Sequence, residues 1–179
     1  MKRIAVLSSL VKRTQNGSLG RTAIMKLAYF LTVLRDVPLG YRFSLYSYGP
    51  FDSAVLQDVD FASTLGALRS QPVLYPSGYG YSIQPGSSSD EIELLEKDFL
   101  DAHEAAIDWV ASEFGNLTSA ELELLSTIVY VDREFVGAPI SKDELARRVH
   151  DIKPHFIEAR ILSRIEDLRT KGLLSACTD

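Results

Sequence analysis

The side chains that most often carry catalysis or bind metals are few in this chain of 179 residues. The histidines are His103, His150 and His155, and the single cysteine is Cys177. Because His150 and His155 are five residues apart, they do not share a helix face as ligands four residues apart do. No Gly-rich phosphate loop, nucleophile elbow or zinc-binding spacing occurs. We therefore expect no enzyme, metal, cofactor or small-molecule substrate, unless residues distant in sequence assemble a site.

Tyrosine is the residue type with the most suggestive placement. Six of the eight tyrosines fall between residues 41 and 81. Phenol rings can stack on nucleic-acid bases, form a docking surface for a protein, or fill a thin core between a small sheet and helices. We single out Tyr79 and Tyr81 as candidate partner-binding residues, with all three uses open.

The net charge of −5 conceals an uneven distribution along the chain. Residues 1–89 contain nine Lys or Arg and four Asp or Glu. Residues 90–123 contain eleven Asp or Glu and one Lys. Because phosphate contacts need local positive potential, a nucleic acid would bind residues 1–89. The alternative is that both regions are solvated surfaces.

A DNA-binding hypothesis assigns a recognition helix to residues 53–68. That helix would enter the major groove, with arginines on the flanking phosphates. Its weakness is the pair of acids Asp58 and Asp60, which repel phosphate. The candidate nucleic-acid-binding residues are Arg21, Arg42, Ser53, Gln57, Thr64 and Arg69.

The pattern of residues 19–83 is that of a winged helix. Apolar residues at helical spacing predict a helix ending near Leu34, with Thr22 near its start as a cap. Alternation over residues 41–46 predicts a strand, and the helix at 53–68 follows. A β-hairpin is predicted from strands at 72–75 and 79–83 with a turn at 76–78.

The Gly- and Ser-rich stretch at residues 86–89 is the best candidate linker. It divides a winged-helix-like domain at 1–86 from a helical domain at 90–179, and we expect both to pack as one compact unit. Residues 90–114 read as one long acidic helix, packed on its own chain or on a second copy, in which Phe99 and Trp109 are candidate partner-binding residues. Its apolar seam would be Ile92, Leu95, Phe99, Ala102, Ala106 and Trp109.

The sequence pattern of residues 140–174 predicts a second helix-turn-helix. Ser141 and Glu144 form a capping box, a helix follows, and a turn at Lys153 leads to a last helix. The whole pattern predicts an α+β fold that is mainly helical.

No stretch approaches the roughly 18 apolar residues of a membrane span. The basic N-terminus lacks a small-residue cleavage site, so we do not interpret it as a signal peptide. The lone Cys177 excludes an internal disulfide and suits a reducing compartment. We expect a soluble, cytoplasmic protein with no membrane contact.

Two motifs resemble known bacterial sequences. Gly20-Arg21 ahead of Lys26-Leu-Ala-Tyr-Phe-Leu31 is similar to the "GR…KL.Y.L" helix of the YwgA-like proteins. Tyr46-Ser-Tyr-Gly-Pro-Phe51 is similar to their "YGPYS" corner, which also occurs in the Panacea (SocA-like) antitoxin and adaptor domain. Phe51-Asp52 departs from the usual Tyr-Ser. The run 124–130, with Arg148-Val-His150 and Lys153-Pro154, is similar to the later part of YwgA-like chains, so the resemblance covers most of the chain. It implies a winged-helix-like fold with no known enzymatic activity.

These observations leave two hypotheses for function. The first is a non-catalytic DNA-binding regulator that uses residues 1–89. The second is a protein-interaction module, antitoxin- or adaptor-like, in which the winged helix is a scaffold and residues 90–114 form a docking or homodimer surface.

Overall fold

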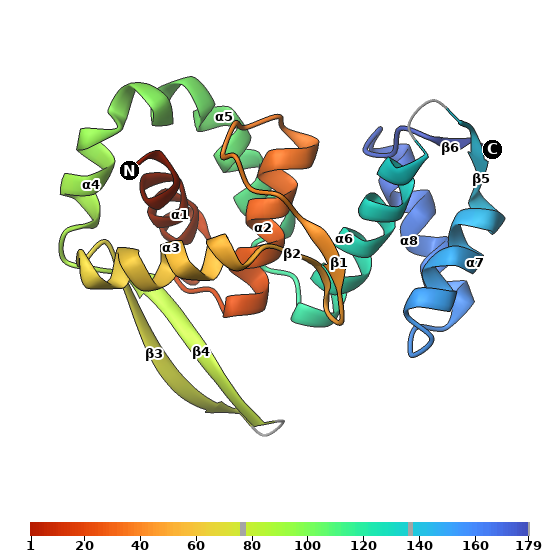
Figure 1. Cartoon of the computed structure of the whole chain (residues 1–179), viewed down its shortest axis with the longest axis horizontal. Helices are drawn as coiled ribbons and strands as arrows, with labels where there is room; N and C mark the ends of the chain where they lie inside the picture. Colours follow the sequence, from red (N-terminus) through yellow and green to blue (C-terminus); the bar gives the residue numbers. More distant parts are fainter. Residues whose placement is uncertain (76–77, 136–137, 179) are drawn as a thin grey trace. The chain divides into compact units, whose positions relative to one another are not determined.

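The computed structural model describes residues 1–75, 78–135 and 138–178, and it confirms a mainly helical α+β fold (Figure 1). The chain forms two compact units. Unit 1 comprises residues 1–44 and 51–119, and unit 2 comprises residues 45–50 and 120–179.

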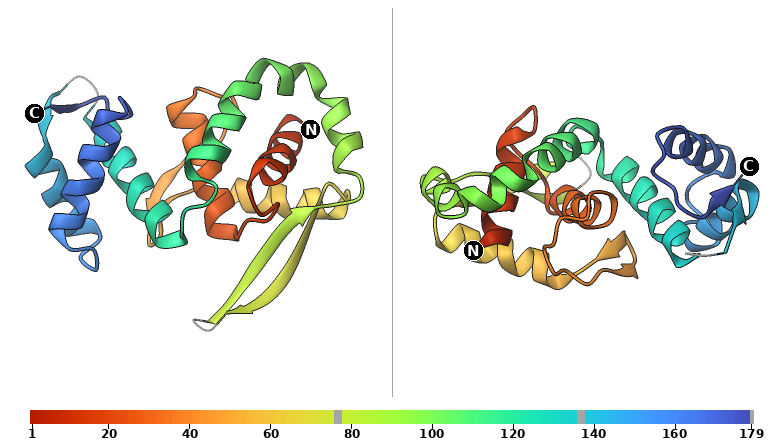
Figure 2. Two further views of the ribbon diagram at one scale, coloured as in Figure 1. Left: turned by 180° about the vertical axis from the view of Figure 1, so that it is seen from behind. Right: turned by 90° about the horizontal axis from the view of Figure 1, so that it is seen from above.

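Helix α1 (Lys2–Arg13) is the centre of unit 1, where other helices enclose it (Figures 1 and 2). Every residue from Ile4 to Val11 is buried, because neighbours cover all sides of the helix and not one stripe. The buried Ser8 donates a hydrogen bond to Glu93 at 2.7 Å. The helices around it are α2 (Arg21–Leu34), α3 (Ser53–Thr64), α4 (Ser89–Leu95) and α5 (Lys97–Phe114).

The predicted single helix at residues 90–114 is wrong, because the chain breaks at Glu96 into α4 and α5. The predicted seam is wrong for the same reason, since the two helices share no continuous stripe. Leu95 is 72% exposed and Ala102 is exposed. The buried side of α5 consists of Leu100, Ile107, Val110, Ala111 and Phe114, which packs on α1 and α2.

Residues 86–89 do not form the predicted linker. Gly86 N–H donates to Ala67 O and Ser88 N–H donates to Gly66 O, both at 2.9 Å. A Cβ at Gly86 would lie 2.1 Å from Gly66 O, so the two backbone segments touch. Because this stretch is packed, α4 and α5 belong to unit 1, and the units divide near residue 119 and not at 86–90.

The strands within the described residues form three two-stranded sheets. Strand β1 (Ser44–Tyr46) is shorter than the predicted 41–46 and pairs with β2 (Gly49–Phe51). Helix α3 ends at Thr64, before the predicted residue 68, because Gly66 (φ +74°) turns the chain into β3. The long hairpin is β3 (Leu68–Tyr75) with β4 (Gly78–Pro85).

The order of helix, strand, helix and hairpin is as expected in residues 19–85, whereas the winged-helix assignment stays a prediction. Among the described strands, β1 and β2 pair only with each other. Pro76 and Ser77 of the predicted hairpin turn lie outside the described residues.

Unit 2 is built on α6 (Ser119–Glu134), α7 (Lys142–Ile152) and α8 (Glu158–Thr170). The predicted cap is confirmed, since the Ser141 hydroxyl accepts from Glu144 N–H. Strand β5 (Ile140–Ser141) pairs in parallel with β6 (Cys177–Thr178). The fully buried Asp132 carboxylate holds this end of the chain by accepting three backbone N–H bonds, from Ser175, Ala176 and Cys177.

The Tyr-Gly-Pro corner is held inside unit 2 by two close contacts. Gly49 has φ +86°, and a Cβ there would lie 3.0 Å from Thr127 Oγ1 on α6. The buried Lys153 donates to Ser47 O and lies 2.8 Å from Glu123 Oε1. Glycine is therefore required at residue 49 for both its backbone conformation and its size.

Candidate docking site: the β3–β4 hairpin and the cavity beside it

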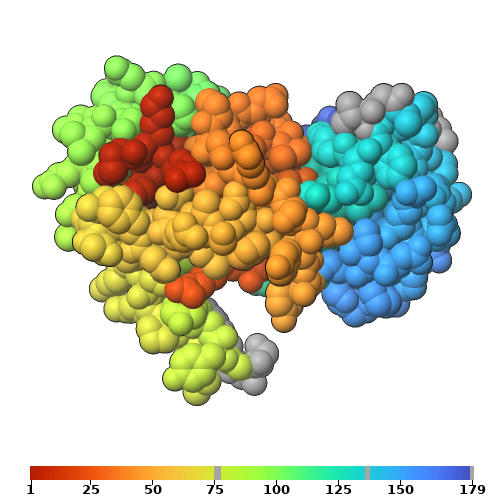
Figure 3. Space-filling model, in the orientation of Figure 1, coloured from red at the N-terminus to blue at the C-terminus, as the bar shows by residue number. Residues whose placement is uncertain are grey.

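The β3–β4 hairpin projects from the rest of unit 1 as a two-stranded ribbon (Figures 1 and 3). Its base is anchored by Leu68 and Ile83, which are buried. Leu19 adds a bridge there, exchanging both of its backbone hydrogen bonds with Ile83 at 2.8 and 2.9 Å. The outer part of the ribbon lies beyond this anchor.

The outer ribbon has one apolar side. Side chains alternate across a strand and face the same side as their direct partners on the next strand. The pairs Pro72–Tyr81 and Leu74–Tyr79 therefore share a side, which we call the tyrosine face. Leu74 is 74% exposed, Tyr79 82% and Tyr81 38%. The opposite side carries Gln71, Val73, Gly80 and Ser82.

A cavity of about 580 Å³ lies beside β4 in unit 1. Residues 79–81 line one wall, and residues 18–23 and 115–119, with Asn16, line the others. The Ser18 and Ser82 hydroxyls are 2.7 Å apart and join the loop before α2 to the ribbon.

Arg21 is the charged residue of this cavity. Its guanidinium stacks on the Tyr81 ring at 3.8 Å from the centroid, and one Nη lies 3.3 Å from Asp60 Oδ1. Its Nε is buried without a hydrogen-bond partner. Arg21 is thus held over the ribbon, with one donor still to be satisfied.

Helix α2 begins at this cavity without a side-chain cap. Its N-cap is Gly20, and the predicted capping by Thr22 is wrong. The first turn contains no acidic residue. The backbone amides of that turn therefore add positive potential to that of Arg21.

The predicted nucleic-acid-binding residues occupy several places in unit 1. Ser53, Gln57 and Thr64 lie on the exposed side of α3, as expected, but Asp60 lies among them and accepts the Thr64 hydroxyl through its backbone carbonyl. The remaining candidates are Arg21 in the cavity, Arg42 ahead of β1, and Arg69 on the ribbon, where it donates to Gln84.

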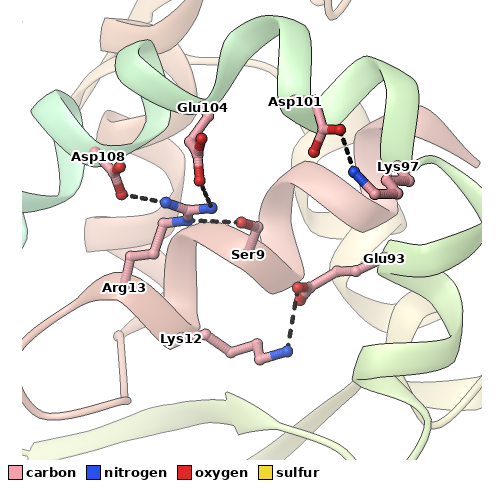
Figure 4. Close-up of polar contacts among 8 residues, drawn as sticks. All are labelled: Ser9, Lys12, Arg13, Glu93, Lys97, Asp101, Glu104 and Asp108. Atoms are coloured by element: carbon pink, nitrogen blue, oxygen red, sulfur yellow. Dashed lines mark hydrogen bonds and ion pairs between the residues drawn. The ribbon is translucent and has the colours of Figure 1, made fainter.

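The positive excess of residues 1–89 is largely offset within unit 1. Arg3 Nε lies 2.9 Å from Asp58. Lys12 pairs with Asp90 and Glu93, and its pKa is raised because these hydrogen bonds outweigh the opposing effect of partial burial. Figure 4 shows Lys12 with Glu93, and Arg13 between Glu104 and Asp108. The acidic helices α4 and α5 thus neutralise α1 of the same chain.

Of the predicted partner-binding residues, only the two on the hairpin point outward. Phe99 is half-buried against Lys2 and His103, and Trp109 is half-buried beneath Arg35. The prediction missed Leu74, which the strand register places directly opposite Tyr79.

The histidines and Cys177 contact neighbouring groups of the described part of the chain. No group of three His, Cys, Asp or Glu there could hold a metal ion. His150 Nδ1 lies 2.9 Å from Phe156 O, and His155 lies 3.6 Å from Glu123. Burial, and then the nearby Asp132, raise the pKa of the Cys177 thiol, which weakens it as a nucleophile.

Comparison with known proteins adds no family. No family model matches the chain, and no curated protein is similar to it. The resemblance to YwgA-like and Panacea proteins therefore stays a prediction. Among the described residues, no helix has the length and apolarity that crossing a membrane requires.

Proposed function

We propose that this protein is a protein-interaction module that docks a partner protein through the β3–β4 hairpin. The observation that carries the proposal is the tyrosine face, formed by Pro72, Leu74, Tyr79 and Tyr81 on a ribbon that projects from its unit. Tyrosine combines a large apolar area with a polar end and few rotatable bonds, which makes it effective at protein interfaces. Unit 1 is the scaffold that presents the ribbon.

The charge distribution favours a protein partner over DNA. A wing that contacts phosphates needs cations, whereas β3 and β4 carry one charged residue, Arg69 near the base. The four cations Arg3, Lys12, Arg13 and Arg21 have acidic partners within unit 1. Asp60 on the exposed side of α3 would repel phosphate.

Site-specific photocrosslinking in the host cell tests this proposal. A photoreactive amino acid replaces Leu74 or Tyr79 in the full chain, and Gln57 on the exposed side of α3 is the matched control site. We expect protein adducts from residues 74 and 79 and none from residue 57.

The protein identified from the adduct is then purified and titrated against the wild type and Leu74→Ser/Tyr79→Ser. The variant should bind roughly tenfold or more weakly, as expected for central aromatic contacts, with an unchanged circular dichroism spectrum. Nucleic-acid adducts at residue 57, adducts of two copies of this chain, or equal affinities would each overturn the proposal.

A further inference from the structure

The outer edge of β4 is open for pairing beyond Ile83. Ile83 directs its N–H and C=O away from β3, toward Leu19. In an antiparallel ladder every second residue does the same, so Tyr81 and Tyr79 also direct their backbone groups outward. Neither residue has a backbone partner on that edge among the described residues.

The outer edge of β3 is blocked. Pro72 pairs with Tyr81, so it occupies an outward-directed position of β3. Proline has no N–H to donate and is one of the residues that protect edge strands from pairing. Strand addition is therefore restricted to the β4 edge, which borders the cavity.

The β4 edge is closed at the base of the ribbon. The bridge from Leu19 occupies the edge at Ile83, and Gly20 lies against Tyr81 O, where a Cβ would be 3.7 Å away. A strand that enters from the tip therefore cannot continue past Tyr81. A partner strand whose chain terminus lies beside Tyr81 satisfies this restriction, because it needs no turn inside the cavity.

The charge at this closed end selects a carboxylate. Among the described residues that line the cavity, Arg21 is the only charged one. Its Nε lacks a partner, and the first turn of α2 is uncapped by any side chain. Asp60 offsets part of this charge, but it is exposed, pairs with one Nη only at 3.3 Å and does not line the cavity. Inside the cavity a C-terminal carboxylate would therefore be attracted, whereas an N-terminal ammonium would face like charge.

We infer that the β4 edge binds the C-terminal tail of a partner protein as an added strand, parallel to β4, with its terminal carboxylate at Arg21. This inference rests on the proposed function and names the chemistry of the partner. Main-chain bonds to Tyr79 and Tyr81 supply affinity that does not depend on sequence, as in other cases of strand addition. The tyrosine face contacts the body of the same partner.

A peptide library with random sequences and free C-termini, displayed through the N-termini, is the probe. Sequences enriched on the full chain are synthesised as free acid and as C-terminal amide, and their affinities are measured by fluorescence anisotropy. We expect roughly tenfold weaker binding of the amide, and a similar loss with Arg21→Gln, because each change removes one charge-assisted contact.

The backbone contact is tested with a matched pair of variants. Tyr79→Ala removes the phenol and keeps the outward N–H, whereas Tyr79→Pro also removes that N–H without breaking a bond to β3. The free-acid peptide should bind Tyr79→Pro roughly tenfold more weakly than Tyr79→Ala. Circular dichroism checks that both variants fold.

Failure of this inference is distinguishable from failure of the proposed function. No enrichment, equal affinity for acid and amide, or equal affinity of the two Tyr79 variants would overturn it. Protein adducts from residues 74 and 79 would then still support hairpin docking. Concentration-dependent dimers that Tyr79→Pro abolishes would assign the edge to a second copy of the chain and overturn the inference.

Discussion

The buried ion pair of unit 2 offers the sharpest test of the packing described above. Lys153 is 3% exposed and Glu123 11%, and their charged atoms are 2.8 Å apart. The Glu123 Oε1 atom has no hydrogen-bond partner, so the contact is ionic. Lys153→Met would remove the buried cation beside Glu123 and leave only the exposed His155, 3.6 Å away, next to the buried carboxylate. Losing one partner of a buried ion pair costs about 3–5 kcal/mol. The substitution also removes the donor to Ser47 O.

The expected free-energy loss applies to unfolding of unit 2, measured by urea titration with far-UV circular dichroism. Lys97→Met is the control for loss of a lysine ion pair, because Lys97 pairs with Asp101 on an exposed surface of α5, where solvent screening leaves little effect on stability. In Lys153→Met/Glu123→Leu most of the loss should be recovered, since a buried ion pair replaced by apolar side chains is often neutral or stabilising. A loss below about 1 kcal/mol for Lys153→Met would refute the buried pairing.

Three further predictions concern the corner and two shifted pKa values. Gly49→Ala should lower the free energy of unfolding at least about twice as much as Gly40→Ala. Both residues have positive φ, which costs an alanine roughly 1–2 kcal/mol, but only a Cβ at residue 49 would also press on Thr127 and Ser126. Equal losses in urea unfolding would contradict this. Hydrogen bonds from Arg147 and then Arg148 lower the pKa of Glu144 from 4.5 to about 2, so its stabilisation is present above pH 4.5 and is lost as pH falls toward 2. Carbon NMR titration of this carboxyl should give a midpoint near 2 that rises in Arg147→Gln/Arg148→Gln, and a midpoint near 4.5 in the wild type would be inconsistent with these pairs. Burial, and then the hydrogen bond to Asp58, raise the pKa of Tyr41 above its ordinary 10.0, so its neutral phenol stabilises the fold below pH 10.0 and this contribution is lost at higher pH. Tyr41→Phe should flatten the alkaline side of the stability profile, and an unchanged profile would show that this phenol does not titrate there.

Local features were predictable from sequence because neighbouring residues determine them. Ser141 caps α7, as the capping box with Glu144 predicted. The hairpin was predictable from two strands around a short turn. The exposure of Tyr79 and Tyr81 was not, because tyrosines at these positions could equally have filled a thin core. The mainly helical class followed from helical spacing of apolar residues.

The errors arose where distant segments meet. Lys12 pairs with acids 78 and 81 residues away, so the basic first half and the acidic segment neutralise each other in a way that composition does not reveal. The 90–114 pattern suited one straight helix, but covering α1 required two helices with a break at Glu96. Residues 86–89 have the composition of a linker, but the backbone carbonyls of Gly66 and Ala67 accept hydrogen bonds from this stretch and hold it in unit 1.

The sequence by itself determined the fold class, the Ser141 cap and a tyrosine-rich hairpin with a single charged residue, Arg69. Only the tertiary structure decided which edge of that hairpin is open. The Leu19–Ile83 bridge sets the direction of the β4 backbone groups, and the start of α2 places Arg21 over Tyr81. Along a strand, successive residues direct their backbone N–H and C=O groups to opposite edges, so the pairing partner decides which residues face the open edge. The pattern of residue types does not identify that partner.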